Sequence, residues 1–257
     1  MHAPERLNDA QLDALDRDGF VVVPDFVPPD LLQALRTRIA EVAAAEGEAA
    51  GREFKPEAGA LRLANCVDKG EPFERAVAMP AILHAVGHVL GPAFKLSSLN
   101  VRTALPRNGI AQPLHCDMAA VPDERGAWVC NVIWMLDDFT PDNGPTRAVP
   151  GTHRLGRLPD APTLPGEVRI TGRAGTVVVM NAHLWHGGDA NHTEHPRTAL
   201  HSFYCRADKP QQQYQKRLLR PETQARLSPG LRRLLALDDP ENDRLSANVG
   251  VVSGFLR

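Results

Sequence analysis

The first ninety residues combine helical spacing of apolar positions with one short extended run. LNDAQLDALDRDGF predicts a short helix with Asn8 or Asp9 as its N-cap and Gly19 at its end, and FVVVPDF predicts a brief strand. PPDLLQALRTRIAEVAAAEG begins with prolines and keeps one apolar helix face, and AMPAILHAVGHVLG predicts another helix. We expect a helical buttress over about residues 1–94 that packs on a sheet. Between its helices, residues 46–60 are small and charged and predict a mobile loop.

From about residue 95 the pattern becomes β-rich. FKLSSLNVRTALP, WVCNVIWMLDDF, EVRIT, GTVVVMN and TALHSFYCR are short runs separated by Gly, Pro, Asn and Asp. Such spacing is typical of a sandwich or barrel-like roll, and it disfavours a βαβ protein. Helical spacing returns from about residue 208 and is broken at Pro221 and Pro229. The pattern therefore predicts one domain over residues 1–257, mainly β, with a core of about 95–207 and a helical C-terminal segment of about 208–257.

Composition narrows the functional classes. Of the 257 residues 43% are hydrophobic, which is enough for a substantial core, and the formal net charge of −2 gives no electrostatic footprint for nucleic acid or an anionic membrane. No apolar run approaches the roughly 20 residues of a membrane helix, and MHAPERLNDAQ lacks the apolar region of a signal peptide. The four cysteines form no CxxC pair. We expect a reduced, soluble, cytoplasmic protein with no nucleic-acid or membrane partner.

The stretch AQPLHCDMAA places His115 and Asp117 two residues apart, so in an extended segment both side chains point to one face. They could share a divalent metal or form a simple hydrogen-bonded pair, and an isolated H-x-D does not decide between the two. His84 and His88 are four apart on a predicted helix. Because they lack the glutamate of HExxH, we expect packing or surface positions for them.

A third metal ligand is available in HLWHGGDAN, where His183 and His186 both qualify. The two glycines that follow His186 would let backbone or ligand approach closely, which favours His186. We expect His183 to support the strand or to face outward.

Alternation along HPRTALHSFYCR places Arg197 on the same side as Ala199 and His201. An arginine that faces inward needs an anion, and its planar guanidinium can bind a carboxylate through two hydrogen bonds. Arg206 is the alternative, although it lies where the run ends.

Two histidines and one carboxylate that bind one face of a metal are typical of non-haem iron(II) oxygenases. A 2-oxo acid can fill two of the remaining positions and O₂ the third, and Arg197 would then bind the far carboxylate of the acid. The ligand set alone does not exclude zinc.

Several segments carry a family resemblance, in order along residues 18–206: DGFVVVPDFV, PLHCD, WMLDDFTPDNGPTRAVPGTHR and HLWHGGDANHTEHPR. They resemble the phytanoyl-CoA dioxygenase-like branch of the Fe(II)/2-oxoglutarate oxygenases. The resemblance implies a double-stranded β-helix, or jelly roll, of the cupin-like kind, with helices covering one sheet. It also implies a set of functional residues: iron ligands His115, Asp117 and His186, 2-oxoglutarate bound by Arg197, and further cosubstrate contacts from Gln112, Trp134 and Thr146.

The resemblance further implies a dioxygenase that uses Fe(II), O₂ and 2-oxoglutarate to hydroxylate an unactivated C–H bond of a small organic substrate, releasing succinate and CO₂. Relatives that halogenate carry a small residue in place of the carboxylate, so Asp117 favours hydroxylation, although desaturation and ring formation use the same site. Two alternatives are a cupin-like metalloenzyme that does not use 2-oxoglutarate, which Arg197 disfavours, and a non-catalytic ligand-binding relative, which the intact ligand set disfavours. An acyl-CoA, an amino acid and a secondary metabolite are all compatible substrates.

Radical chemistry requires a site that excludes water. Because they are small, charged or Gln-rich, residues 46–70 and the segment Gln211 to Lys216 are predicted to be mobile and to tighten when substrate binds.

Overall fold

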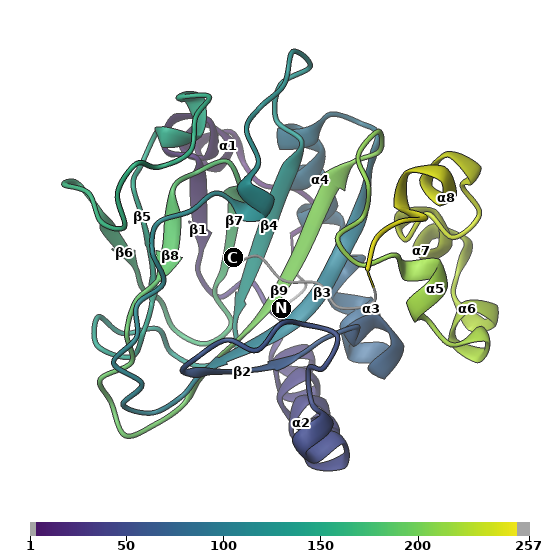
Figure 1. Ribbon diagram of the computed structural model, residues 1–257, viewed down its shortest axis with the longest axis horizontal. Coiled ribbons are helices and arrows are strands. Elements are labelled where there is room, and N and C mark those ends of the chain that lie inside the picture. Colours follow the sequence, from purple (N-terminus) through teal and green to yellow (C-terminus); the bar gives the residue numbers. More distant parts are fainter. Residues whose placement is uncertain (1–3, 251–257) are drawn as a thin grey trace.

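Two antiparallel β-sheets form the centre of the computed structural model, which describes residues 4–250 (Figure 1). Within these residues the larger sheet has the strand order β1-β7-β4-β9-β3-β2 and the smaller has the order β6-β5-β8. The strands are β1 Phe20–Val23, β2 Ala60–Leu63, β3 Phe94–Ala104, β4 Val129–Met135, β5 Thr146–Ala148, β6 Val168–Ile170, β7 Val177–Asn181, β8 His186–Gly188 and β9 Arg197–Arg206. This is the predicted double-stranded β-helix with flanking helices.

The helices of the first ninety residues pack on the outer face of the larger sheet. They are α1 Asp9–Asp18, α2 Pro29–Glu46, α3 Glu71–Val77 and α4 Pro80–Leu90. The helices of the C-terminal segment are α5 Gln215–Leu218, α6 Pro221–Arg226, α7 Pro229–Leu234 and α8 Pro240–Ser246. Asn8 caps α1 by accepting a hydrogen bond from the backbone of Gln11, and Gly19 ends it with a φ of 84°, as predicted. Helix α4 lies on β4 and β7. Together the helices of the first ninety residues bury the apolar outer face of the larger sheet.

Alternation in β4 separates this core from the space between the two sheets. Val132 and Trp134 belong to the cluster shared with the helices, whereas Ile133 and Met135 belong to a second cluster that faces the smaller sheet. One face of the larger sheet is thus closed by helices, and the other is available for a site.

A β-bulge in β3 changes which residues reach that inner face. The register with β9 shifts between Leu96 and Ser98, so Ser97 is the extra residue. Its backbone carbonyl accepts a hydrogen bond from the backbone N–H of Gln213 at 3.0 Å. The bulge therefore fixes the start of the C-terminal segment, whose helices α5–α8 lie beside β3 (Figure 1).

The structure corrects three expectations about segments. The predicted strand β1 joins the larger sheet, but the buttress also supplies an unexpected strand, β2, which lies within the segment expected to be mobile. The four glutamines between Gln211 and Gln215 are at most 6% exposed and hydrogen-bonded into the fold, which disagrees with the expectation of a mobile segment from Gln211 to Lys216. The strands β5 and β8 were not expected. No helix among residues 4–250 is long and apolar enough to cross a membrane.

Candidate metal and cosubstrate site

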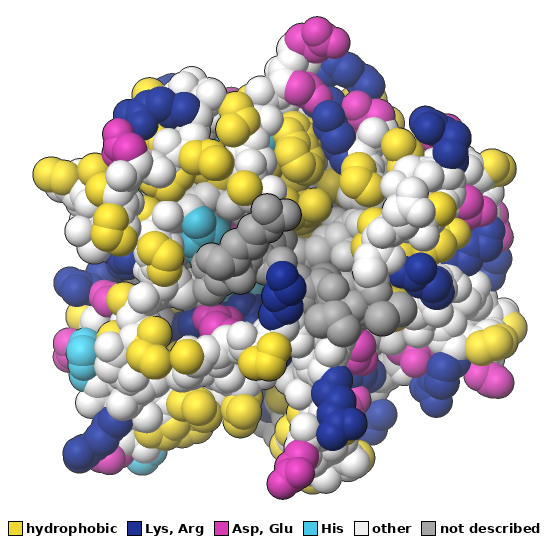
Figure 2. Space-filling view, viewed as in Figure 1, with side chains coloured by type: hydrophobic (Ala, Val, Ile, Leu, Met, Phe, Trp, Pro, Cys, Tyr) yellow, Lys and Arg dark blue, Asp and Glu magenta, His cyan; other side chains and the backbone are white. Residues whose placement is uncertain are grey.

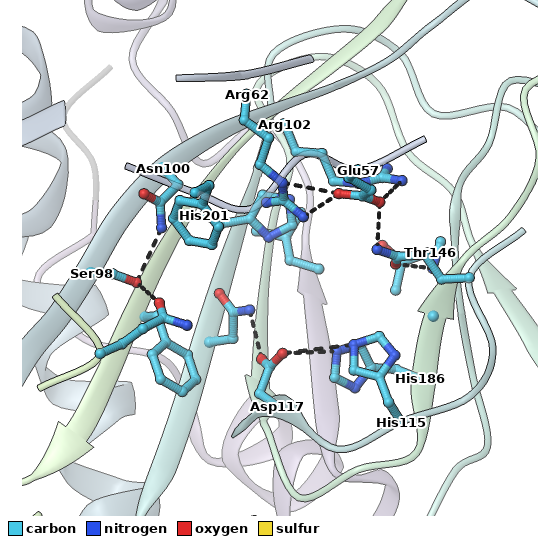
Figure 3. Close-up of a pocket in the computed structure, with 18 of the residues that line it drawn as sticks. Glu57, Arg62, Ser98, Asn100, Arg102, His115, Asp117, Thr146, His186 and His201 are labelled. Atoms are coloured by element: carbon cyan, nitrogen blue, oxygen red, sulfur yellow. Dashed lines mark hydrogen bonds and ion pairs between the residues drawn. The ribbon is translucent and has the colours of Figure 1, made fainter. Parts of the chain in front are cut away.

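Backbone pairing brings the three predicted metal ligands together. His115 and His186 exchange backbone hydrogen bonds of 2.9 and 3.0 Å, which joins the segment after β3 to strand β8. Asp117 follows two residues later and donates its backbone N–H to Ala182. Its carboxylate Oδ1 lies 3.9 Å from Nε2 of His115 and 3.6 Å from Nε2 of His186 (Figure 3). One ligand atom from each residue lies within 4.8 Å of the other two.

The remaining polar atoms of the three residues are held by the protein. Nδ1–H of His115 donates to the carbonyl of Pro113 at 3.0 Å, and Nδ1–H of His186 donates to that of Leu184 at 2.8 Å. Both Nε2 lone pairs are thereby directed to the same point as Asp117. The amide of Asn131 donates to Asp117 Oδ2 at 2.9 Å, which leaves Oδ1 for a metal. These residues fit a divalent iron ion bound on one face.

The electrostatics of the group suit a cation. Burial, together with the neighbouring His186, lowers the pKa of His115 to about 4, so its imidazole is neutral at pH 7. Burial alone would raise the pKa of Asp117, but the two histidines and Asn131 outweigh it and lower the pKa to about 2. Burial would likewise lower the pKa of His186, and Asp117 reverses the shift and raises it. The group thus provides imidazole nitrogens around one buried carboxylate.

The rival histidine is occupied elsewhere. Nδ1–H of His183 donates to the carbonyl of Ala120 at 3.1 Å, and its Nε2 accepts the backbone N–H of Trp128 at 3.0 Å. Because both ring nitrogens are used, His183 holds the chain around the site and offers no metal ligand. The two histidines of α4 are also bound elsewhere, because His88 pairs with Asp16 and His84 with Arg6, and neither lines the pocket.

Arg197 lines the same pocket as the triad and is only 2% exposed. One of its nitrogens donates to the carbonyl of Gly144, its guanidinium lies 4.2 Å from the ring centre of Phe139, and its Nε has no partner among the described residues. Burial and the nearby Arg102 lower its pKa to about 9, so it is still charged at pH 7. A buried guanidinium with a free donor fits the far carboxylate of 2-oxoglutarate.

The guanidinium of the alternative arginine, Arg206, is already occupied by two carboxylates. It is bound to the carboxylates of Asp123 and Asp208 and does not line the pocket. The structure therefore places Arg197, and not Arg206, where a cosubstrate can bind.

Two of the three weaker cosubstrate predictions lie in the pocket and one does not. Thr146 lines it from β5, and Gln112 lines it with its amide between Glu57 and the backbone N–H of Gly188. Trp134 is fully buried on the helix side of the sheet, where its indole N–H donates to Ser202. The expectation of a cosubstrate contact by Trp134 is corrected, because the pleat of β4 presents its neighbour Ile133 to the pocket.

A buried acid in the pocket was missed from the sequence. Glu57, from the loop before β2, accepts hydrogen bonds from Arg62 of β2, Arg102 of β3 and Gln112 (Figure 3). Burial would raise its pKa, but the two arginines outweigh it and lower the pKa to about 2. The loop composition gave no signal for this role, because Arg102 lies 45 residues along the chain from Glu57 and only the folded sheet brings it near.

Comparison with known proteins identifies the family. The family model described as phytanoyl-CoA dioxygenase (PhyH) matches residues 15–199, which is most of the chain. The chain belongs to the phytanoyl-CoA dioxygenase family. This confirms the resemblance seen in the sequence and, with it, the enzyme class: a 2-oxoglutarate-dependent non-haem iron dioxygenase that uses Fe(II) and O₂.

Curated relatives of this family member differ in how much of their length it spans. L-proline trans-4-hydroxylase from Streptomyces griseoviridis is 26% identical over 231 residues, covering 74% of this chain and 83% of that protein. Dioxygenase af480 from Aspergillus fumigatus is 30% identical over 164 residues, but the match covers 62% of this chain and only 52% of that protein.

A solved structure supports the fold. EctD from S. alaskensis with 2-oxoglutarate and 5-hydroxyectoine superimposes with a TM-score of 0.66 at 22% identity, covering 78% of this chain and 76% of that one.

Proposed function

We propose that this dioxygenase hydroxylates an unactivated C–H bond of a small organic molecule, with His115, Asp117 and His186 holding Fe(II) and Arg197 holding 2-oxoglutarate. The observation that carries the proposal is that two imidazoles, one carboxylate and one arginine with an unpartnered Nε line a single pocket. When bound, the metal and 2-oxoglutarate supply the oxidising chemistry and release succinate and CO₂.

The residues of the chain orient the metal ligands and the cosubstrate. The carbonyls of Pro113 and Leu184 fix the two imidazole tautomers, and Asn131 fixes which oxygen of Asp117 faces the metal. Arg197 would bind the far carboxylate of 2-oxoglutarate and so orient the cosubstrate. Asp117 provides the only negative charge among the ligands and fills the position that a halide would need, which favours hydroxylation over halogenation.

The substrate is proposed to be small on the basis of relatives named for small molecules. L-proline trans-4-hydroxylase and the ectoine dioxygenase of Halomonas elongata, 26% identical over 238 residues, are both of this kind. We propose a cytoplasmic location, which is supported by the finding that all four cysteines are buried free thiols.

The test is the turnover of 2-oxoglutarate. Purified anaerobically and mixed with Fe(II) and 2-oxoglutarate, the protein should develop the visible charge-transfer band of the chelate and, on exposure to O₂, form succinate. A screen across substrate classes under ¹⁸O₂ should give a product carrying one ¹⁸O atom. Oxidation of a substrate without 2-oxoglutarate, or a chlorinated product in the presence of chloride, would contradict the proposal.

A further inference from the structure

Buried polar side chains form one wall of the pocket, beside the triad and away from Thr146 (Figure 3). This polar wall consists of Ser98 and Asn100 from β3, Asn131 from β4 and Gln212 from the C-terminal segment. Each of the four is at most 8% exposed. Such burial of uncharged polar groups is costly unless each finds a hydrogen-bond partner.

Three of the seven polar side-chain atoms of the wall have no hydrogen-bond partner among the described residues. Ser98 donates to the side-chain oxygen of Gln212 and accepts from the amide of Asn100 at 3.1 Å, and the amide of Asn131 donates to Asp117. This leaves Nε2 of Gln212, Oδ1 of Asn100 and Oδ1 of Asn131, none of which has a partner within residues 4–250. One donor and two acceptors are therefore buried at the pocket with nothing bound to them.

We propose that the polar wall binds the substrate, and that the substrate is a small hydrophilic molecule offering both hydrogen-bond acceptors and donors, such as hydroxyl, amine or amide groups. The inference rests on the proposed function, in which the metal and 2-oxoglutarate occupy the side of the pocket with the triad and Arg197. Because the amide of Asn131 donates to the metal ligand Asp117, its side chain lies beside the proposed metal site. A substrate N–H or O–H bound there would sit close to the carbon that reacts.

A hydrocarbon chain fits this wall poorly. The large apolar residues that line the pocket are only Phe54, Pro56, Ile133 and Phe203 among the described residues. An acyl chain would cover the three free polar atoms without bonding them, and sites built around hydrogen bonds discriminate strongly against ligands that lack them. The wall therefore disfavours acyl-CoA as the substrate.

The C-terminal segment has a role in this arrangement. The hydroxyl of the bulge residue Ser97 accepts the backbone N–H of Gln212 at 2.6 Å, and its carbonyl accepts that of Gln213. Gln211 anchors the same segment by donating to the carbonyl of Leu96 at 2.8 Å. These bonds deliver the side chain of Gln212 to the pocket, so the bulge and the C-terminal segment together complete the substrate wall.

The experiment measures binding to the anaerobic Fe(II)–2-oxoglutarate complex, both by the shift of its visible band and by calorimetry. One probe set contains free amino acids, amino alcohols and small polyols, and the other contains straight-chain fatty acids and acyl-CoA thioesters. The tightest probe is then titrated into Gln212→Met and Asn100→Leu. Gln213→Met is the matched control, since this neighbouring glutamine is equally buried but does not line the pocket.

We expect the tightest binder to come from the hydrophilic set and its affinity to fall roughly 10- to 100-fold in each wall variant but not in the control. The two wall variants are independent tests, so if one of them fails to fold, the other still tests the inference. An unchanged chelate band in a variant shows that its metal site is intact. Binding of acyl chains only, no hydrophilic binder, or a hydrophilic binder that the wall variants do not weaken would overturn the inference. Absence of the chelate band in the wild-type protein would instead overturn the proposed function.

Discussion

Replacing Glu57 with glutamine removes the one carboxylate that neutralises two arginines in the pocket. The pKa of this group is lowered from 4.5 to about 2, mainly by Arg102 and Arg62 acting against burial. Because each pKa unit corresponds to about 1.4 kcal/mol, the ionised carboxylate contributes about 3 kcal/mol to the free energy of unfolding at neutral pH. Glu57→Gln keeps the shape but leaves both guanidinium groups facing an amide. We expect a loss of about 2–4 kcal/mol, or roughly 5–15 °C in Tm for a chain of this size.

The lowered pKa of Glu57 also predicts how the stability effect of Glu57→Gln depends on pH. A carboxyl group whose pKa is lowered on folding stabilises the protein above its unfolded pKa, and this contribution is lost as the pH falls through the folded value. The difference in stability between wild type and Glu57→Gln should therefore be complete at pH 7 and shrink between about pH 4.5 and pH 2.

Urea denaturation followed by circular dichroism across this pH range is the assay. Glu241→Gln is the control, because it breaks an exposed pair with Arg244 and should leave the midpoint nearly unchanged. A Glu57→Gln midpoint equal to that of wild type at pH 7, or a difference that does not diminish with acid, would refute the reasoning.

Three further predictions follow from the pocket. Arg197→Ala should weaken 2-oxoglutarate binding roughly 30- to 1000-fold in a chelate-band titration, whereas Arg206→Ala should not; the opposite pattern would make Arg206 the cosubstrate residue. Trp134→Phe should lower the free energy of unfolding by about 1–2 kcal/mol through its lost hydrogen bond while leaving the KM for 2-oxoglutarate unchanged, and a raised KM would return Trp134 to the site. Amide hydrogen exchange in residues 46–70 should slow when substrate joins the iron complex, and equal protection in both states would argue against a lid there.

The sequence pattern predicted those features that depend on neighbouring residues, such as helix ends and the face on which a strand side chain lies. The caps of α1 followed from residue type, and the longer strands of the core and the shared face of Arg197 and His201 followed from alternation, which sets side-chain direction in a strand. The expectation for Trp134 came from the family resemblance instead, and alternation along β4 places its side chain on the helix side of the sheet. Ile133 is the residue that alternation presents to the pocket.

Long-range features could not be predicted in this way. The bulge at Ser97 interrupts the alternation of β3 and lets Leu96 pack in the core while Ser98 lines the pocket. The glutamines after β9 were expected to be mobile because the segment is Gln-rich, yet they are buried and hydrogen-bonded to the bulge. Glu57 depends on the neighbouring Arg62 and on Arg102, which only the folded sheet brings near. Each of these depends on pairing between distant segments, which composition does not encode.

The central claim is that His115, Asp117 and His186 hold the iron while the nearby His183 does not. Metal analysis of the protein loaded anaerobically with Fe(II), together with the 2-oxoglutarate charge-transfer band, measures this directly. We expect one iron per chain in the wild type and in His183→Ala, and loss of both iron and band in His186→Ala and Asp117→Ala. Full iron binding by His186→Ala with loss in His183→Ala would contradict it.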